Sequence, residues 1–129
     1  MPSGADWYDD ERTMVRAWVS DPWDWGDYQA CIDAVVARFD ETDAQIAVLI
    51  DFSDSTGMPR SGSGVTRLRA VTAITDHPQF EHGVVCGLTT RMGQTLTAIF
   101  SRVYGSLDVA ACVEDGATLV ANKRGASRH

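Results

Sequence analysis

A chain of 129 residues that is 44% hydrophobic and 22% charged has the composition of a globular protein with one domain. Its net charge of −7 argues against general nucleic-acid binding, because phosphate contacts require a basic surface. The sequence shows neither an apolar run long enough to span a bilayer nor a secretory signal. We therefore expect one cytoplasmic domain over residues 1–129, with its core at about 6–122 and a short flexible C-terminal tail.

The start of the chain predicts a pair of strands. In TMVRAWVS (13–20), two kinds of side chain alternate, which is typical of a strand whose faces differ. One face carries Val15, Ala17 and Val19, and the other carries Met14, Arg16 and Trp18. We expect ADWY (5–8) to pair with this strand through the polar turn DDER (9–12).

The segment 21–41 predicts a turn followed by a helix that faces the core. Asp24 can cap this helix, with Asp27 three residues later as the second half of a capping box. Apolar side chains then recur at helical spacing in one stripe, namely Tyr28, Ile32, Val35, Val36 and Phe39.

The rest of the chain alternates apolar runs with helical patterns. QIAVLIDF (45–52) predicts a central strand covered on both faces. After the next loop, a second helix is predicted from Val65, Leu68, Val71 and Thr72, and it ends before the proline of DHPQ (76–79). There follow a strand at GVVCGL (83–88), a helix at 89–105, a strand at LDVAACV (107–113), and a short helix at 114–124 capped by Asp115 or Glu114.

Repeated strand–helix–strand units require mostly parallel pairing with right-handed crossovers. The sequence therefore predicts a small α/β sandwich with a mostly parallel sheet of four to five strands and about four helices. Parallel strands place their carboxyl ends on one edge, where open α/β sheets usually bind their ligands. We expect a binding or regulatory region there, formed by Asp51, Ser53, Arg60, Ser61, Ser63, Thr89, Thr90 and Arg91.

Seven segments carry a family resemblance through their order and spacing. They are WDWGDYQAC (23–31), IAVLIDFSDS (46–55), MPRSGSG (58–64), ITDHPQF (74–80), VVCGL (84–88), TAIFSRVYG (97–105) and VEDGATLVA (113–121). Together they resemble the STAS superfamily, and more closely its SpoIIAA-like (STAS/SEC14-like) branch of small stand-alone bacterial proteins. The resemblance implies a SpoIIAA-like fold and a non-enzymatic regulatory domain, similar to anti-sigma factor antagonists, that acts through protein contacts without a cofactor.

The same resemblance implies a possible phosphoacceptor. In anti-anti-sigma members, a partner kinase phosphorylates a serine at the start of the helix after the central strand. Ser63 is the positional match, Ser61 is its neighbour, and Arg60 stands where the motif has aspartate. The residues alone leave two interpretations, because Ser63 can cap the helix, or can carry a phosphate that would meet Arg60, Arg67 or Arg91.

Three further alternatives concern the same region. Four arginines near or just after the loop either form a solvated helix face or bind an acidic or phosphorylated partner, namely Arg60, Arg67, Arg69 and Arg91. Asp51 and Asp54 form a carboxylate pair, or Asp51 caps the loop. A small anion or nucleotide can bind at the strand ends, and the SEC14-like side of the resemblance implies a lipid or another apolar ligand.

The aromatic residues and the cysteines complete the candidates. The four tryptophans, Trp7, Trp18, Trp23 and Trp25, fill the core and fix the first helix, form a protein interface, or line a pocket. We expect Met14 and Trp18 to form an apolar patch that a homodimer or a partner buries. Cys31, Cys86 and Cys112 predict reduced core thiols, and the histidines at 77, 82 and 129 lack metal-ligand spacing, so we expect no metal.

Overall fold

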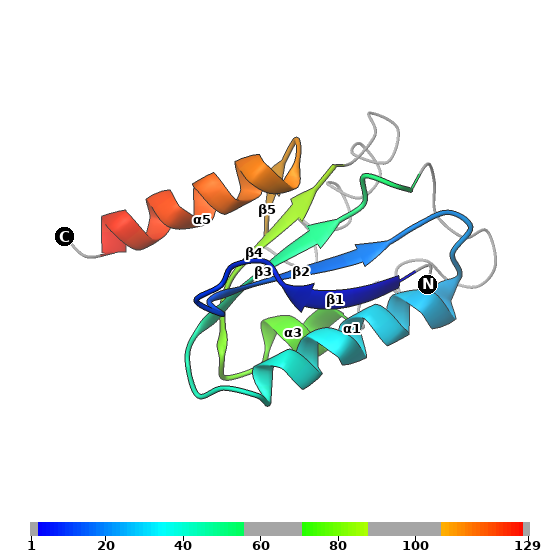
Figure 1. The fold of residues 1–129 in the computed structure, drawn as a ribbon, viewed down its shortest axis with the longest axis horizontal. Coiled ribbons are helices and arrows are strands. Elements are labelled where there is room, and N and C mark those ends of the chain that lie inside the picture. Colours follow the sequence, from blue (N-terminus) through cyan, green and yellow to red (C-terminus); the bar gives the residue numbers. More distant parts are fainter. Residues whose placement is uncertain (1–2, 56–70, 88–106, 128–129) are drawn as a thin grey trace.

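The structure is a computed structural model that describes residues 3–55, 71–87 and 107–127. Within these ranges, five strands form one sheet in the order β1-β2-β3-β4-β5, so described strands that follow one another in the chain are neighbours in space (Figure 1). The strands are β1 (Ser3–Trp7), β2 (Met14–Val19), β3 (Ile46–Asp51), β4 (Phe80–Cys86) and β5 (Leu107–Ala110). β1 is antiparallel to β2, and the other three pairs are parallel, which confirms the mostly parallel α/β sheet.

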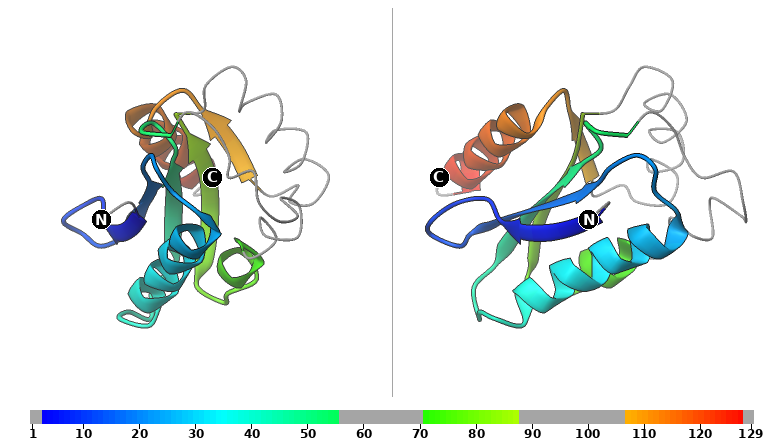
Figure 2. Two further views of the ribbon diagram at one scale, coloured as in Figure 1. Left: turned by 90° about the vertical axis from the view of Figure 1, so that its right-hand side faces the viewer. Right: turned by 45° about the vertical axis from the view of Figure 1, so that its right-hand side comes forward.

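Three helices lie within the described residues and cover both faces of the sheet. They are α1 (Trp25–Phe39), α3 (Thr72–Thr75) and α5 (Val113–Ser127). α1 and α3 pack on one face, while α5 lies on the other face near β3, β4 and β5 (Figure 2). The predicted helix at 89–105 and most of the predicted second helix lie outside the described residues.

The structure confirms the burial predicted for β2 and β3 and the predicted start of α1. Val15, Ala17 and Val19 are buried, whereas the alternate residues of β2 are only partly buried. All six residues of β3 are buried, because helices pack on both sides of this central strand. The capping box of α1 is also confirmed, since the Asp24 side chain accepts a hydrogen bond from the Asp27 amide and the Asp27 side chain accepts one from the Asp24 amide.

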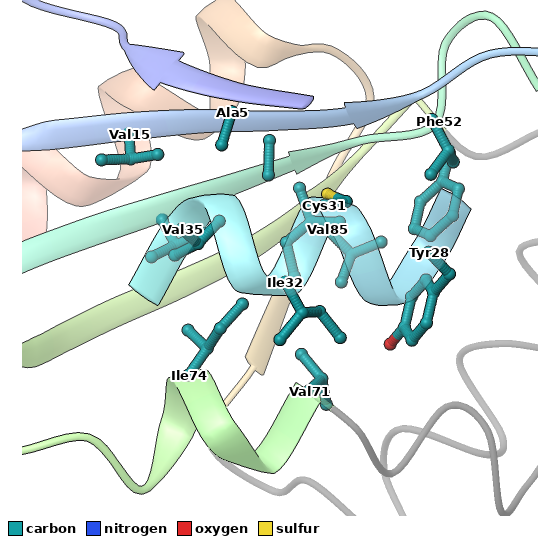
Figure 3. Packing of buried hydrophobic residues seen from close by; sticks show 14 of the residues in the cluster. Ala5, Val15, Tyr28, Cys31, Ile32, Val35, Phe52, Val71, Ile74 and Val85 are labelled. Carbon is teal, nitrogen blue, oxygen red and sulfur yellow. The ribbon is translucent and has the colours of Figure 1, made fainter. Parts of the chain in front are cut away.

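The larger core cluster fills the space between the sheet, α1 and α3. Figure 3 shows Ile74 and Val71 directed from the α3 side toward Ile32, with Val35 and Val85 nearby. The inward stripe of α1 differs from the prediction, because Val36 is only partly buried. Trp25 and Cys31 are buried instead. The stripe turns toward β1 and β2, which lie next to this helix.

The last third of the chain corrects three predicted boundaries. β4 begins at Phe80, three residues before the predicted start, and β5 ends at Ala110. Val113 opens α5, which runs to Ser127 and is not short, so Glu114 and Asp115 lie in its first turn and are not its caps. The helix starts at Val113 because Val113, Gly116 and Val120 are buried at helical spacing. They pack in a second core cluster between α5 and the sheet, which includes Ala47, Leu49, Val84 and Cys86.

Candidate functional site

The carboxyl ends of the parallel strands form one edge of the sheet. In the strand register, Trp18 is opposite Asp51, Asp51 is opposite Cys86, and Cys86 is opposite Ala110. The structure therefore brings Asp51 and Ser53 beside Gly87, just before the segment that contains Thr89, Thr90 and Arg91. Those three residues, with Arg60, Ser61, Ser63, Arg67 and Arg69, lie outside the described residues.

The Asp51 side chain is the polar centre of this edge, and it is only 5% exposed. Its Oδ2 accepts hydrogen bonds from Arg16 Nε at 3.0 Å and Arg16 Nη2 at 2.8 Å, and its Oδ1 accepts one from the Ser53 amide at 2.8 Å. Burial alone would raise the pKa of Asp51, but the Ser53 and Arg16 hydrogen bonds and the Arg16 charge outweigh it and lower the pKa. The interpretation of Asp51 as a cap on the loop is thus confirmed.

Gly87 fixes the turn that follows β4. Its φ of +73° lies in the left-handed region, and a Cβ atom built on it would lie 2.2 Å from Ser53 Oγ and 2.9 Å from the Ser53 amide nitrogen. The backbone on both sides is also held, because the Phe52 amide donates to the Cys86 carbonyl and the Gly87 amide donates to the Ala110 carbonyl. Only glycine allows this close approach of two loops.

Ser55 anchors the entrance to the segment 56–70. It is 1% exposed, its Oγ accepts a 2.7 Å hydrogen bond from Trp23 Nε1, and its amide donates to the Phe52 carbonyl. A second tie joins the same two loops, since the Asp21 amide donates to the Asp54 carbonyl at 3.0 Å. Sequence reasoning missed Ser55, because the tryptophan bonded to it lies 32 residues away and no local pattern links the two.

The Trp23 side chain that binds Ser55 is packed in a cluster of aromatic residues. Trp23 contacts Trp25 edge to face with ring centroids 5.5 Å apart, and it lies 6.2 Å from Phe52 and 6.3 Å from Tyr28. All four side chains are buried in the larger core cluster. Trp23 and Trp25 therefore fill the core and fix the start of α1, which was the first of the three interpretations of the tryptophans. At the other end of the segment, Val71 is 1% exposed in the same cluster.

The cavity between the sheet, α1 and α3 bears on the apolar-ligand alternative. It is lined by Ala17, Trp18, Val19, Tyr28, Cys31, Ile32, Ile50, Phe52, Val71 and Ile74. Its volume of about 10 Å³ is close to the least that can hold one water molecule, and its lining is almost wholly apolar. A lipid chain does not fit there.

The thiols near the site are structural. All three cysteines are free, and Cys31 and Cys86 are buried as expected, whereas Cys112 is partly exposed and so is not a core thiol. Burial raises the pKa of Cys31 and of Cys86 to about 12, which keeps both thiols protonated and poorly nucleophilic. In residues 3–55, 71–87 and 107–127, no three side chains of the metal-binding types gather into a possible metal site.

Within the part of the chain that the structure describes, no helix has the length and apolar character needed to cross a membrane. Comparison with known proteins adds no family to this geometry, since no protein-family model matches the chain and no curated protein matches it. What can be inferred about function therefore comes from the residues and their arrangement.

Proposed function

We propose that this domain is a regulatory or scaffolding protein that acts through protein contacts, with the carboxyl edge of the sheet and the segment 56–70 as its contact region. The observation that carries this proposal is the anchoring of the segment at both ends. Ser55 Oγ accepts a hydrogen bond from Trp23 Nε1, and Val71 is packed in the larger core cluster. The chain on either side of the segment is thus fixed to the core, and the Ser55 end lies at the carboxyl edge of the sheet.

The polar groups of this edge favour binding over turnover. Both carboxylate oxygens of Asp51 accept hydrogen bonds, and its lowered pKa makes it a weak base. The Cys86 thiol is buried against α5, where Gly116 approaches it closely. These groups hold the loops in place, while Ser53 and Asp54 are exposed residues of the same edge.

The family resemblance names a regulatory mechanism for this region, and we propose that Ser63 is the phosphoacceptor. A phosphate adds close to two negative charges and several strong acceptors, so it would recruit or repel a partner docked on the loop. In this mechanism the protein itself performs no chemistry, because a partner kinase supplies the phosphate. The proposal makes protein binding, and not stability, the property that responds to the charge of Ser63.

Variants of Ser63 test this function. We expect Ser63→Asp to bind a different set of proteins from the native host, while Ser63→Ala binds the same set as the wild type, because only the first adds charge at the docking loop. Pull-down with the three forms, followed by mass spectrometry of the bound proteins and of Ser61 and Ser63, makes the comparison.

Thr118→Asp is a matched control, since it adds the same charge at an exposed position on α5. Its set of bound proteins should equal that of the wild type. Identical sets for all forms, with phosphate on neither Ser61 nor Ser63, would contradict the proposal. Such a result would favour a ligand-binding function at the same edge.

A further inference from the structure

We propose that β1 and β2, on the side of the sheet where α5 is the only described helix and does not reach them, bind a second copy of this chain. We call this surface the open face and define it by Gly4, Asp6, Arg16 and Trp18. The antiparallel register places Gly4 opposite Trp18 and Asp6 opposite Arg16, so all four lie on the side of the sheet that carries α5. α5 itself packs on β3, β4 and β5 (Figures 1 and 2).

The Trp18 and Arg16 side chains of the open face are held in place by contacts within the chain. A Cβ atom on Gly4 would lie 2.7 Å from Trp18 Cζ2, so the indole ring lies across β1 where only glycine leaves room for it. The Arg16 guanidinium stacks 5.0 Å from the centre of that ring and is fixed by its two bonds to Asp51. Tryptophan and arginine are the residue types most often found at binding hot spots, and their fixed positions reduce the entropy that binding costs.

The charges of the open face match a second copy of it. Asp6 is exposed, and its described hydrogen bond is the local one from the Trp7 amide to Oδ1. Among the described residues, Arg16 Nη1 has no hydrogen-bond partner, because Nε and Nη2 both bind Asp51. A two-fold axis through the face can pair Asp6 of each copy with Arg16 of the other, since such an interface contacts itself.

This complementarity selects a second copy over a strongly charged partner. An acidic segment placed on the face would meet Asp6, and a basic one would meet Arg16, so either would face a like charge. Met14 contributes less than the sequence predicted, because it lies on the same side but packs against the second core cluster. The inference does not depend on the proposed function, although Arg16 and Trp18 lie next to Asp51 of the carboxyl edge.

Sedimentation velocity of the purified chain over a range of concentrations up to about 1 mM tests the inference, since small interfaces bind weakly. The wild type should show a monomer–dimer equilibrium that weakens as salt is added. Asp6→Lys should weaken the dimer by about tenfold or more, because each dimer contains the affected pair twice. Asp6 is exposed, so this variant should remain folded, as circular dichroism will show.

Three matched variants separate the open face from other surfaces. Asp10→Lys makes the same charge change at an exposed position in the β1–β2 turn and should leave the dimer unchanged. Trp18→Phe keeps a flat ring and should retain most of the association, whereas Trp18→Glu should abolish it. A wild type that is monomeric at every concentration would overturn the inference. So would a dimer that Asp6→Lys and Trp18→Glu leave intact.

Discussion

Replacing Gly87 with alanine is expected to lower the free energy of unfolding by about 3 kcal/mol. Two costs add at this position. The φ of +73° is strained for any residue with a Cβ atom, and that atom would overlap Ser53 Oγ at 2.2 Å. Because Ser53 is held through its amide by Asp51, the two loops cannot separate without breaking that bond. Urea unfolding followed by circular dichroism measures the loss.

Gly125→Ala is the matched control for this prediction. Gly125 lies in α5, and a Cβ atom there would meet nothing within 4 Å. Alanine is the better helix former, so this variant should be as stable as the wild type or more stable by up to about 1 kcal/mol. Equal stability of Gly87→Ala and the wild type would show that the contact between the two loops is not tight.

Replacing Asp51 with asparagine is expected to cost about 1–3 kcal/mol at neutral pH, because Arg16 then loses a charged partner that is almost fully buried. Arg16 is 36% exposed, and solvent around it keeps the loss below that of a fully buried pair. A double-mutant cycle with Arg16→Gln should give a coupling energy that accounts for most of the loss.

The pair also makes the stability depend on pH. The pKa of Asp51 is lowered in the folded state, so its contribution is present above the usual aspartate value of 3.8 and is lost as the pH falls through the folded-state value. The difference in unfolding free energy between the wild type and Asp51→Asn should therefore shrink on acidification. Burial raises the pKa of Asp9, but hydrogen bonds from Thr13 and Met14 outweigh it and lower the pKa. Asp9 therefore leaves some acid sensitivity in both proteins.

Glu41→Gln serves as the control, since its pair with Arg38 is partly exposed and lies outside the sheet. That variant should change stability by less than about 1 kcal/mol. If Asp51→Asn were as stable as Glu41→Gln at neutral pH, then the Arg16–Asp51 pair would not hold the edge together.

Local patterns in the sequence predicted much of the fold. The alternation in β2 predicted its buried residues correctly, and the spacing of Asp24 and Asp27 predicted the start of α1. Both patterns depend only on residues that are close together in the sequence. The predicted end of β5 was wrong because local patterns alone do not distinguish a strand from a buried helix start. A short apolar run at 107–113 fits a strand, and only the burial of Gly116 and Val120 assigns Val113 to the helix.

The contacts that build the candidate site could not be predicted in the same way. The Arg16–Asp51 pair joins residues 35 apart, and the Trp23–Ser55 bond joins residues 32 apart. The first depends on the register of the parallel strands β2 and β3, and the second on how two loops pack together, and a single sequence specifies neither. The expectation that Asp51 lies at a strand end was available from the pattern of β3, but its partner was not.

Site-specific photo-crosslinking in the native host tests the proposed function most directly. A crosslinker at Asp54 lies on the carboxyl edge beside the segment 56–70, and one at Asp43 lies on the opposite edge, before β3. We predict that position 54 captures a discrete protein that position 43 does not, and that Ser63→Asp changes this capture whereas Ser63→Ala does not. The same products at both positions, or a capture at position 54 that Ser63→Asp leaves unchanged, would contradict the proposal that this edge is a regulated protein-binding site.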